Sequence, residues 1–313
     1  MAGHIDVFDD FHVHGASAPE WNQRYMQISP GVMRSRLTEF TGGRVHVFRK
    51  WLSERVVQQG GLPGDQLCFA LPLRPGDGEP IAQGRPLPMD GLLALRGGAD
   101  FTLQRPRNME LLAVTLDSEA LRWQLDAAQM KLPQGAARSS VLNISHDAAE
   151  ALRARLLVLL AGEQPEPLAL ASIVDALFRS LAEAGGVTPS VARVTAAYVV
   201  SQTHRMVMAE APNVLSVATV CARLRISRRT LQNSFRLVAA TTPLDYMRAV
   251  RLNAVRARLH GSDRFALTIG QAAADCGFDH LSHFIERYNA LFGELPSRTA
   301  RSVVQATSGV TLA

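Results

Sequence analysis

The chain has 313 residues, 47% of them hydrophobic and 19% charged, with a net charge of +5, which predicts a folded protein long enough for two cores. Its three cysteines, Cys68, Cys221 and Cys276, lie far apart, which excludes a disulfide framework and fits a reducing compartment. Residues 1–15 lack the basic start and apolar core of a signal peptide, and no apolar run reaches ~20 residues, so we expect a cytoplasmic protein without membrane association.

The charge is unevenly divided along the chain. Residues 1–188 contain 18 basic and 21 acidic side chains, whereas residues 189–313 contain 15 basic and 7 acidic ones. All the bases of the second segment are arginines. This division indicates a phosphate-bearing partner for the second segment, with a solvated basic surface as the alternative.

Residues 28–116 have the pattern of short strands separated by turns. Apolar runs with strand spacing occupy residues 32–40, 45–52, 65–73, 91–98 and 109–116. The Gly42-Gly43 pair predicts a hairpin between the first two runs. Clusters of glycine and proline divide the later runs, as in a small sandwich or barrel.

Helical spacing replaces this pattern after residue 117. The predicted helices span residues 118–131, 147–161 and 168–184. The second of them carries one stripe of leucines, formed by Leu152, Leu156 and Leu159. Such a stripe suits dimerisation through a helix of a second copy, with packing onto the chain's own sheet as the alternative.

A domain boundary is predicted at residues 185–190, where Gly-Gly ends one helix and Pro-Ser opens the next. We therefore expect an N-terminal effector or dimerisation domain at residues 1–186 and a helical domain at residues 187–303. Residues 304–313 are predicted to be a flexible tail.

A domain that only dimerises, without a ligand, is one alternative to these roles, and a metal site in the N-terminal domain is another. His12, His14, Glu20 and His46 are the right ligand types, but no second ligand cluster follows them, so we expect no metal. Neither a nucleophile–base spacing nor a phosphate-binding glycine loop is present, so we expect no cofactor and no enzyme. The competing class is a metal- or ligand-binding protein whose helical domain mediates protein interaction.

The first part of the helical domain reads as a short helix, a tight turn and a second helix. Residues 216–224 form the first helix, and Ser227 is predicted to cap the second, which spans residues 228–238. Leu231 and Phe235 face inward at helical spacing. The outer face contains Arg228, Arg229, Gln232, Asn233 and Arg236. Arginine can bind guanine bidentately and Gln or Asn can bind adenine, so this face predicts major-groove contact, with a solvated polar face as the alternative.

One uninterrupted helix follows, from Pro243 to His260, closed by Gly261. At ~1.5 Å per residue it forms a rod near 25 Å long, which can separate two DNA-reading units by about one turn of the duplex. Four arginines lie on this rod: Arg248, Arg251, Arg256 and Arg258. For each, a phosphate contact and an internal salt bridge remain open.

The helix–turn–helix pattern recurs at residues 268–292. Gly277 is placed at the tight turn, and Phe284 and Tyr288 face inward. The outer face of residues 280–291 includes His280, Leu281, His283, Glu286 and Arg287. Because Glu286 would repel phosphate, we expect this unit to contribute less specificity than the first.

The segment 189–301 resembles the AraC/XylS family of bacterial transcription regulators. The resemblance rests on ISRRTLQNSF (226–235), TPLDYMRAVRL (242–252), NAVRARL (253–259) and, in the second unit, GF (277–278), SHF (282–284) and FG-x-x-PS (292–297). Arg225 and Ala240 depart from it by replacing common glycines, and Leu295 by replacing Thr or Ser. Within the family, residues 227–233 and 251–256 are most similar to regulators of ethanolamine-utilisation operons.

The resemblance implies an α+β multidomain protein. Its N-terminal domain would be β-rich and cupin-like or jelly-roll-like, with dimerisation helices, and its all-α C-terminal domain would hold two helix-turn-helix motifs. Arg229, Gln232 and Asn233 would be the leading base contacts, and Leu281, Ser282 and Glu286 fall at corresponding positions in the second motif. The implied function is sequence-specific regulation of transcription, as an activator on double-stranded promoter DNA. The expected partners are a second copy of the chain, a small-molecule effector and RNA polymerase.

Overall fold

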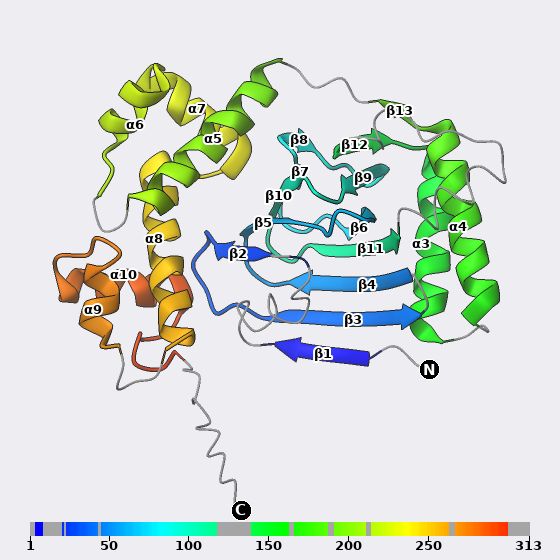
Figure 1. Ribbon diagram of the computed structural model, residues 1–313, viewed down its shortest axis with the longest axis horizontal. Coiled ribbons are helices and arrows are strands. Elements are labelled where there is room, and N and C mark those ends of the chain that lie inside the picture. Colours follow the sequence, from blue (N-terminus) through cyan, green and yellow to red (C-terminus); the bar gives the residue numbers. More distant parts are fainter. Residues whose placement is uncertain are drawn as a thin grey trace, which may run out of the picture.

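The computed structural model describes residues 4–8, 21, 23–42, 45–117, 139–162, 166–186, 191–210, 214–262 and 267–299. Strands form most of the N-terminal region and helices form the C-terminal domain, which confirms the predicted order of classes (Figure 1). The predicted helix 118–131, the tail 304–313 and the candidate ligands His12, His14 and Glu20 lie outside the described residues.

The described strands form two antiparallel sheets. The first has the order β1-β3-β4-β11-β6-β9-β12-β13 and the second the order β2-β5-β10-β7-β8. The strands of the first sheet are β1 (His4–Phe8), β3 (Ser35–Gly42), β4 (Val45–Leu52), β6 (Gln66–Arg74), β9 (Gly91–Arg96), β11 (Glu110–Asp117), β12 (Ser140–Asn143) and β13 (Gly185–Gly186). Those of the second are β2 (Arg24–Gln27), β5 (Val56–Gly61), β7 (Ile81–Ala82), β8 (Arg85–Pro86) and β10 (Asp100–Arg105).

The predicted hairpin and the predicted strand at residues 109–116 are both present. β3 and β4 pair from Ser35 opposite Leu52 to Gly42 opposite Val45, which confirms the predicted pairing of the two strands. β11 lies between β4 and β6 and is buried on both faces. Its alternate residues therefore serve two cores: Leu112 packs with the helices, whereas Leu111 packs with the second sheet.

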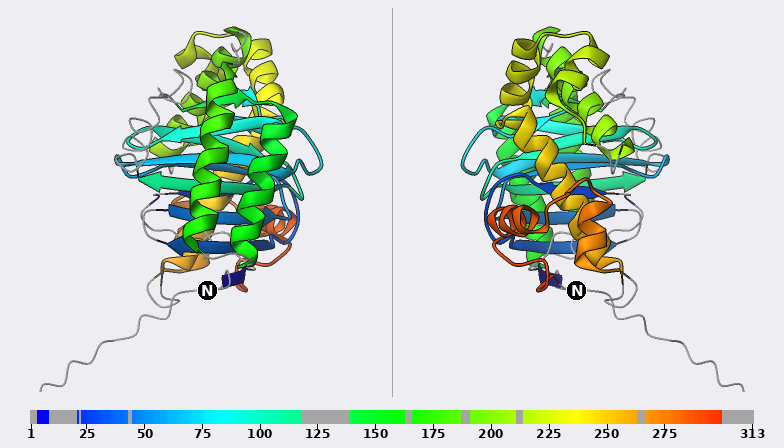
Figure 2. Two further views of the ribbon diagram at one scale, coloured as in Figure 1. Left: turned by 90° about the vertical axis from the view of Figure 1, so that its right-hand side faces the viewer. Right: turned by 90° about the vertical axis from the view of Figure 1, so that its left-hand side faces the viewer.

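The N-terminal region has three layers. Side chains of both sheets meet in one apolar cluster that includes Phe48, Leu93 and Phe101. The opposite face of the first sheet is covered by α3 (His146–Ala161) and α4 (Glu166–Glu183), which lie side by side in Figure 2. The C-terminal helices lie on the other side of the molecule (Figure 2).

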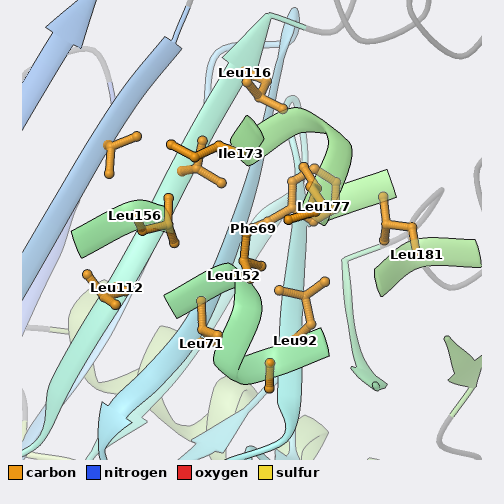
Figure 3. Close-up of a cluster of buried hydrophobic side chains, with 14 of the residues drawn as sticks. Phe69, Leu71, Leu92, Leu112, Leu116, Leu152, Leu156, Ile173, Leu177 and Leu181 are labelled. Atoms are coloured by element: carbon orange, nitrogen blue, oxygen red, sulfur yellow. The ribbon is translucent and has the colours of Figure 1, made fainter. Parts of the chain in front are cut away.

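The leucine stripe of α3 is buried within this chain, which corrects the predicted dimerisation surface. Leu152 and Leu156 are 0% exposed and Leu159 is 2% exposed. They belong to the core between α3, α4 and the first sheet, where Leu152 and Leu156 lie beside Phe69 and Leu112 (Figure 3). Helical periodicity shows that one face of a helix is apolar but does not say what covers that face. Here the cover is the chain's own sheet.

Six helices make up the described C-terminal domain. They are α5 (Val191–Ala209), α6 (Val217–Leu224), α7 (Arg228–Ala239), α8 (Pro243–His260), α9 (Ile269–Ala274) and α10 (Leu281–Phe292). One apolar cluster joins α5, α6, α7 and the first half of α8, and another joins the second half of α8 with α9 and α10. The long helix α8 therefore belongs to two small cores and holds them at its two ends.

Candidate nucleic-acid interface

The first helix pair is built by local capping. The Ser216 hydroxyl accepts a hydrogen bond from the Thr219 N–H at the start of α6, and the Ser227 hydroxyl accepts one from the Thr230 N–H at the start of α7 (both 3.0 Å). Between them, α6 ends at Leu224 and is capped by Arg225, whose φ of 53° is left-handed. The predicted turn and the predicted cap Ser227 are therefore both confirmed.

The inner and outer faces of α7 are as the sequence predicted. Leu231 and Phe235 are fully buried. The polar residues Arg228, Arg229, Gln232, Asn233 and Arg236 are all exposed. Arg228 and Arg229 have no acidic partner in the described part of the chain, so two guanidinium groups stand free beside two carboxamides on one face.

The second helix pair, α9 and α10, has a different cap and a different turn residue. A capping box joins Thr268 and Gln271 at the start of α9, and Gly277 takes a φ of 77° in the turn, as predicted. Phe284 and Tyr288 are fully buried in α10. The outward residues His280, Leu281, Ser282, His283, Glu286 and Arg287 are all exposed. This face carries one carboxylate and an exposed leucine, so it is less basic than that of α7.

The rod α8 runs without a break from Pro243 to His260, as predicted, and Thr242 caps its start. Its 18 residues span roughly 27 Å at ~1.5 Å per residue. Because most of its circumference is buried between the two small cores, its ends cannot turn freely relative to each other. The exposed faces of α7 and α10 are thus held at a set separation.

The arginines of α8 have partners inside the chain. Arg248 pairs with Asp245 (2.9 Å) and Arg256 with Glu294 (2.7 Å), and Arg258 pairs with Asp275. Arg251 donates to the Gly277 carbonyl (3.1 Å) and lies over the Phe278 ring. Of the two possibilities left open for these residues, the structure therefore shows internal contacts. Those of Arg251, Arg256 and Arg258 join α8 to the region of the second helix pair, whereas the Arg248 pair lies within α8.

No sequence pattern predicts the contact between β2 and the C-terminal domain. The Asn253 carboxamide accepts from the Gln27 N–H (3.0 Å) and donates to the Gln27 carbonyl (2.9 Å). The Gln27 side chain in turn donates to the Leu291 carbonyl at the end of α10 (2.8 Å). Tyr25 and Met33 pack in the same cluster as α8, α9 and α10. One strand of the N-terminal region therefore binds both the rod and the second helix pair.

Two buried basic residues, Lys50 and Arg105, lie next to Tyr25 of this contact. The Lys50 ammonium donates to the Tyr25 hydroxyl (2.6 Å), and the fully buried Arg105 donates to the Lys50 carbonyl (2.8 Å). Burial, and then the charge of Arg105, lowers the pKa of Lys50 to about 7. Burial lowers the pKa of Arg105 to about 10. The alternating strand pattern does not reveal these residues, because a lysine within a strand is normally assigned to the solvent face.

The candidate metal ligand His46 has a different partner. Its Nε2 lies 3.1 Å from the Glu39 carboxylate. Among the described residues, no three His, Cys, Asp or Glu side chains gather as metal ligands would. None of the helices described is both long enough and apolar enough to cross a membrane.

Comparison with known proteins concerns mainly the C-terminal domain. Residues 220–302 match the family described as a helix-turn-helix domain. The chain is 39% identical over 87 residues to the XylDLEGF operon transcriptional activator of Pseudomonas putida, over 28% of this chain and 27% of that protein. It is 32% identical over 95 residues to the probable thc operon regulatory protein of Rhodococcus erythropolis, over 30% of this chain and 29% of that protein. These matches span less than a third of either relative.

Some solved structures match most of the chain. One of them is the AraC-like transcriptional activator CuxR, with a TM-score of 0.44 and 17% identity, covering 80% of this chain and 94% of that one.

Proposed function

We propose that this chain, whose C-terminal domain is of the AraC/XylS type, is a transcription regulator that binds specific sequences of double-stranded promoter DNA. The proposal is carried by one observation. Two outward helix faces, on α7 and α10, lie at the two ends of the rigid helix α8. The length of α8, roughly 27 Å, together with the helices packed at its ends, allows a separation of about one DNA turn, ~34 Å. In this arrangement α7 and α10 enter two consecutive major grooves on one side of the duplex.

The first helix-turn-helix motif reads bases through α7. Arg229, Gln232 and Asn233 lie within about one turn of one another, so their side chains project from a single exposed patch. Arginine matches the acceptors of guanine, and the two carboxamides match adenine. Arg228 and Arg236 bind the phosphates on either side of this patch, which places α7 in the groove.

The second motif makes a smaller contribution through α10. Leu281 is 48% exposed and contacts thymine methyl groups, while Ser282, His283 and Arg287 bind bases or backbone. Glu286 lies 3.8 Å from His283 on this face and repels phosphate. The first motif therefore sets most of the sequence preference, and the second adds length to the site.

The N-terminal region supplies the remaining functions. We assign it to a cupin-like domain at residues 1–186, which pairs two chains and responds to a small effector, and assign residues 187–303 to DNA binding. Two linked copies bind paired half-sites with greater avidity than one. Because α3 buries its leucines, the homodimer uses another surface. The chain acts as an activator through RNA polymerase. The likeness of residues 227–233 to ethanolamine-operon regulators concerns DNA recognition and does not identify the effector.

Selection from random DNA tests this function. The full chain is incubated with a pool of randomised duplexes, bound molecules are recovered over several rounds, and individual survivors are measured by gel shift at increasing salt. We expect a shared motif with two blocks about one helical turn apart, and affinity that falls steeply with salt. Recovery of unrelated sequences, all bound as weakly as the starting pool, would overturn the assignment.

A further inference from the structure

A cleft of about 720 Å³ lies between the second sheet and α5. Its volume falls within the range of roughly 300–1,000 Å³ that small-molecule sites occupy. β2, β5 and β10 form one wall, and one face of α5, with Ser201, His204 and Met208, forms the other. In Figure 1 α5 runs beside this sheet, at the junction of the N-terminal region and the helices. The cleft therefore touches both parts of the protein.

Two free cations face each other across this cleft. Arg24 comes from β2 and Arg205 from α5, and both side chains are exposed. Within the described residues neither guanidinium has an acidic partner, whereas the arginines of α8 are almost all paired. Asp100 is the one carboxylate among the described residues that line the cleft.

A buried histidine adds a polar group with no partner. His204 is only 7% exposed, and its Nδ1 has no hydrogen-bond partner among the described residues. Burial, and then the charge of Arg24, lowers the pKa of His204 to about 4, so the ring is neutral at physiological pH. A buried ring nitrogen without a partner is uncommon, and a ligand in the cleft would satisfy it.

The charge and the apolar lining together define the class of ligand. Two arginines, one aspartate and a neutral histidine leave one net positive charge, which matches a monoanion better than a doubly charged phosphate. Met208 and Ala209, both exposed on α5, supply apolar surface beside the charged groups. We propose that this cleft binds a small organic carboxylate, whose anionic group is held by Arg24 and Arg205 and whose apolar body lies against Met208.

The cleft is connected to the recognition helix by packed rings. His204 makes an edge contact with Tyr246 at 6.3 Å between centroids, and Tyr246 contacts Phe235 at 5.1 Å. Phe235 lies on the buried face of α7, directly under the polar residues proposed to read DNA. A carboxylate that binds both α5 and the second sheet therefore fixes the position of the rings against which α7 packs. This regulatory role rests on the proposed DNA-binding function, whereas the binding site does not.

Ligand binding is measured without DNA, by thermal unfolding and calorimetry of the full chain. The probes are acetate, hexanoate and phenylacetate, each compared with its neutral amide and with inorganic phosphate. We expect at least one carboxylate to raise the unfolding temperature while its amide does not. Arg205→Gln and Arg24→Gln should each weaken binding roughly 10- to 100-fold, as expected for the loss of a charged hydrogen bond. Arg34→Gln, an exposed arginine elsewhere on the N-terminal region, should leave the affinity unchanged.

Three results would overturn the site: no response to any of the three carboxylates, an equal response to the amides or to phosphate, or binding that survives Arg24→Gln combined with Arg205→Gln. Both positions are exposed, so these variants should fold. Since no DNA is present, a negative result leaves the DNA-binding proposal standing. A chain that binds carboxylate but selects no DNA motif would instead contradict the regulator.

Discussion

The side-chain amide of Asn253 on α8 pairs with both backbone polar groups of Gln27 on β2, although 226 residues separate them. The Asn253 carboxamide thus bonds the N–H and the carbonyl of Gln27 as a residue of a neighbouring strand would. The same amide also donates to the Ala249 carbonyl, which fixes its orientation on the rod. The contact thus links the N-terminal region to the helix that separates the two proposed DNA-reading faces.

Removing this amide should loosen the junction. Asn253→Ala leaves the buried N–H and carbonyl of Gln27 without partners, and we expect a loss of about 2–4 kcal/mol in the free energy of unfolding. Chemical denaturation measures it. The matched control is Asn289→Ala on the exposed face of α10, which should change stability by less than about 0.5 kcal/mol. Equal losses in the two variants would contradict an energetic role for the Gln27 contact.

Among the described residues of the helical domain, two hold a left-handed backbone without being glycine: Arg225 (φ 53°) and Ala240 (φ 46°). A residue with a Cβ atom is destabilised by roughly 1–2 kcal/mol in this conformation. Glycine avoids this strain, but part of the gain is offset because glycine loses more conformational entropy on folding. Ala240→Gly should therefore stabilise the protein by about 0.5–1 kcal/mol.

Ala257→Gly on an exposed position of α8 is the control, and should destabilise by about 0.5–1 kcal/mol because that backbone is helical. Thermal unfolding of the two variants side by side would show opposite shifts. Shifts of the same sign would mean that the turn after α7 is not left-handed.

The buried position of Leu156 predicts loss of stability when it is truncated. Leu156→Ala should cost about 2–5 kcal/mol, as for other buried leucines, while the folded fraction keeps the oligomeric mass of the parent protein. Denaturation and sedimentation velocity give the two readouts. An unchanged free energy of unfolding with a halved mass would restore the leucine stripe as a dimer interface.

Lys50 predicts a pH dependence of stability. Its pKa is about 7 in the folded protein and near the ordinary 10.5 when unfolded, so the unfolded chain binds more protons between these values. Its contribution to stability therefore rises with pH from about 7 to about 10 and is constant below that window. Lys50→Met should remove this contribution.

The unfolding free energy of Lys50→Met should accordingly exceed that of the parent protein by the largest amount at about pH 6. This difference should become smaller towards pH 10. Subtracting the parent's unfolding free energy from that of the variant at each pH removes the contributions of all groups that titrate alike in both proteins. A difference that does not change with pH would show that the fold does not lower the pKa of Lys50.

Sequence patterns were sufficient where short-range chemistry decides the structure. Ser227 and Gly277 were predicted because caps and tight turns depend on a few neighbouring residues. The inward faces of α7 and α10 followed from helical spacing. The exposure of Arg229, Gln232 and Asn233 followed in the same way, although exposure does not test whether they contact DNA.

Patterns failed where the partner is distant in the chain. The stripe of Leu152 could meet either a second copy or the first sheet, and only the fold distinguishes them. Nothing near Asn253 or Lys50 marks either residue as buried, because the hydrogen-bond partners Gln27 and Tyr25 lie 226 and 25 positions away in the chain. The cleft at Arg24 and Arg205 depends on the same long-range arrangement.

The affinity of Arg229→Ala for a selected duplex, and for random DNA, tests the central claim most directly. We predict a loss of about 1–3 kcal/mol on the selected site, a relaxed base preference at one position, and little change on random DNA. Arg298→Ala, which replaces an exposed arginine outside α7 and α10, is the control and should not alter base preference. An equal loss on selected and random DNA would show that Arg229 contacts only phosphate, and would contradict sequence reading by α7.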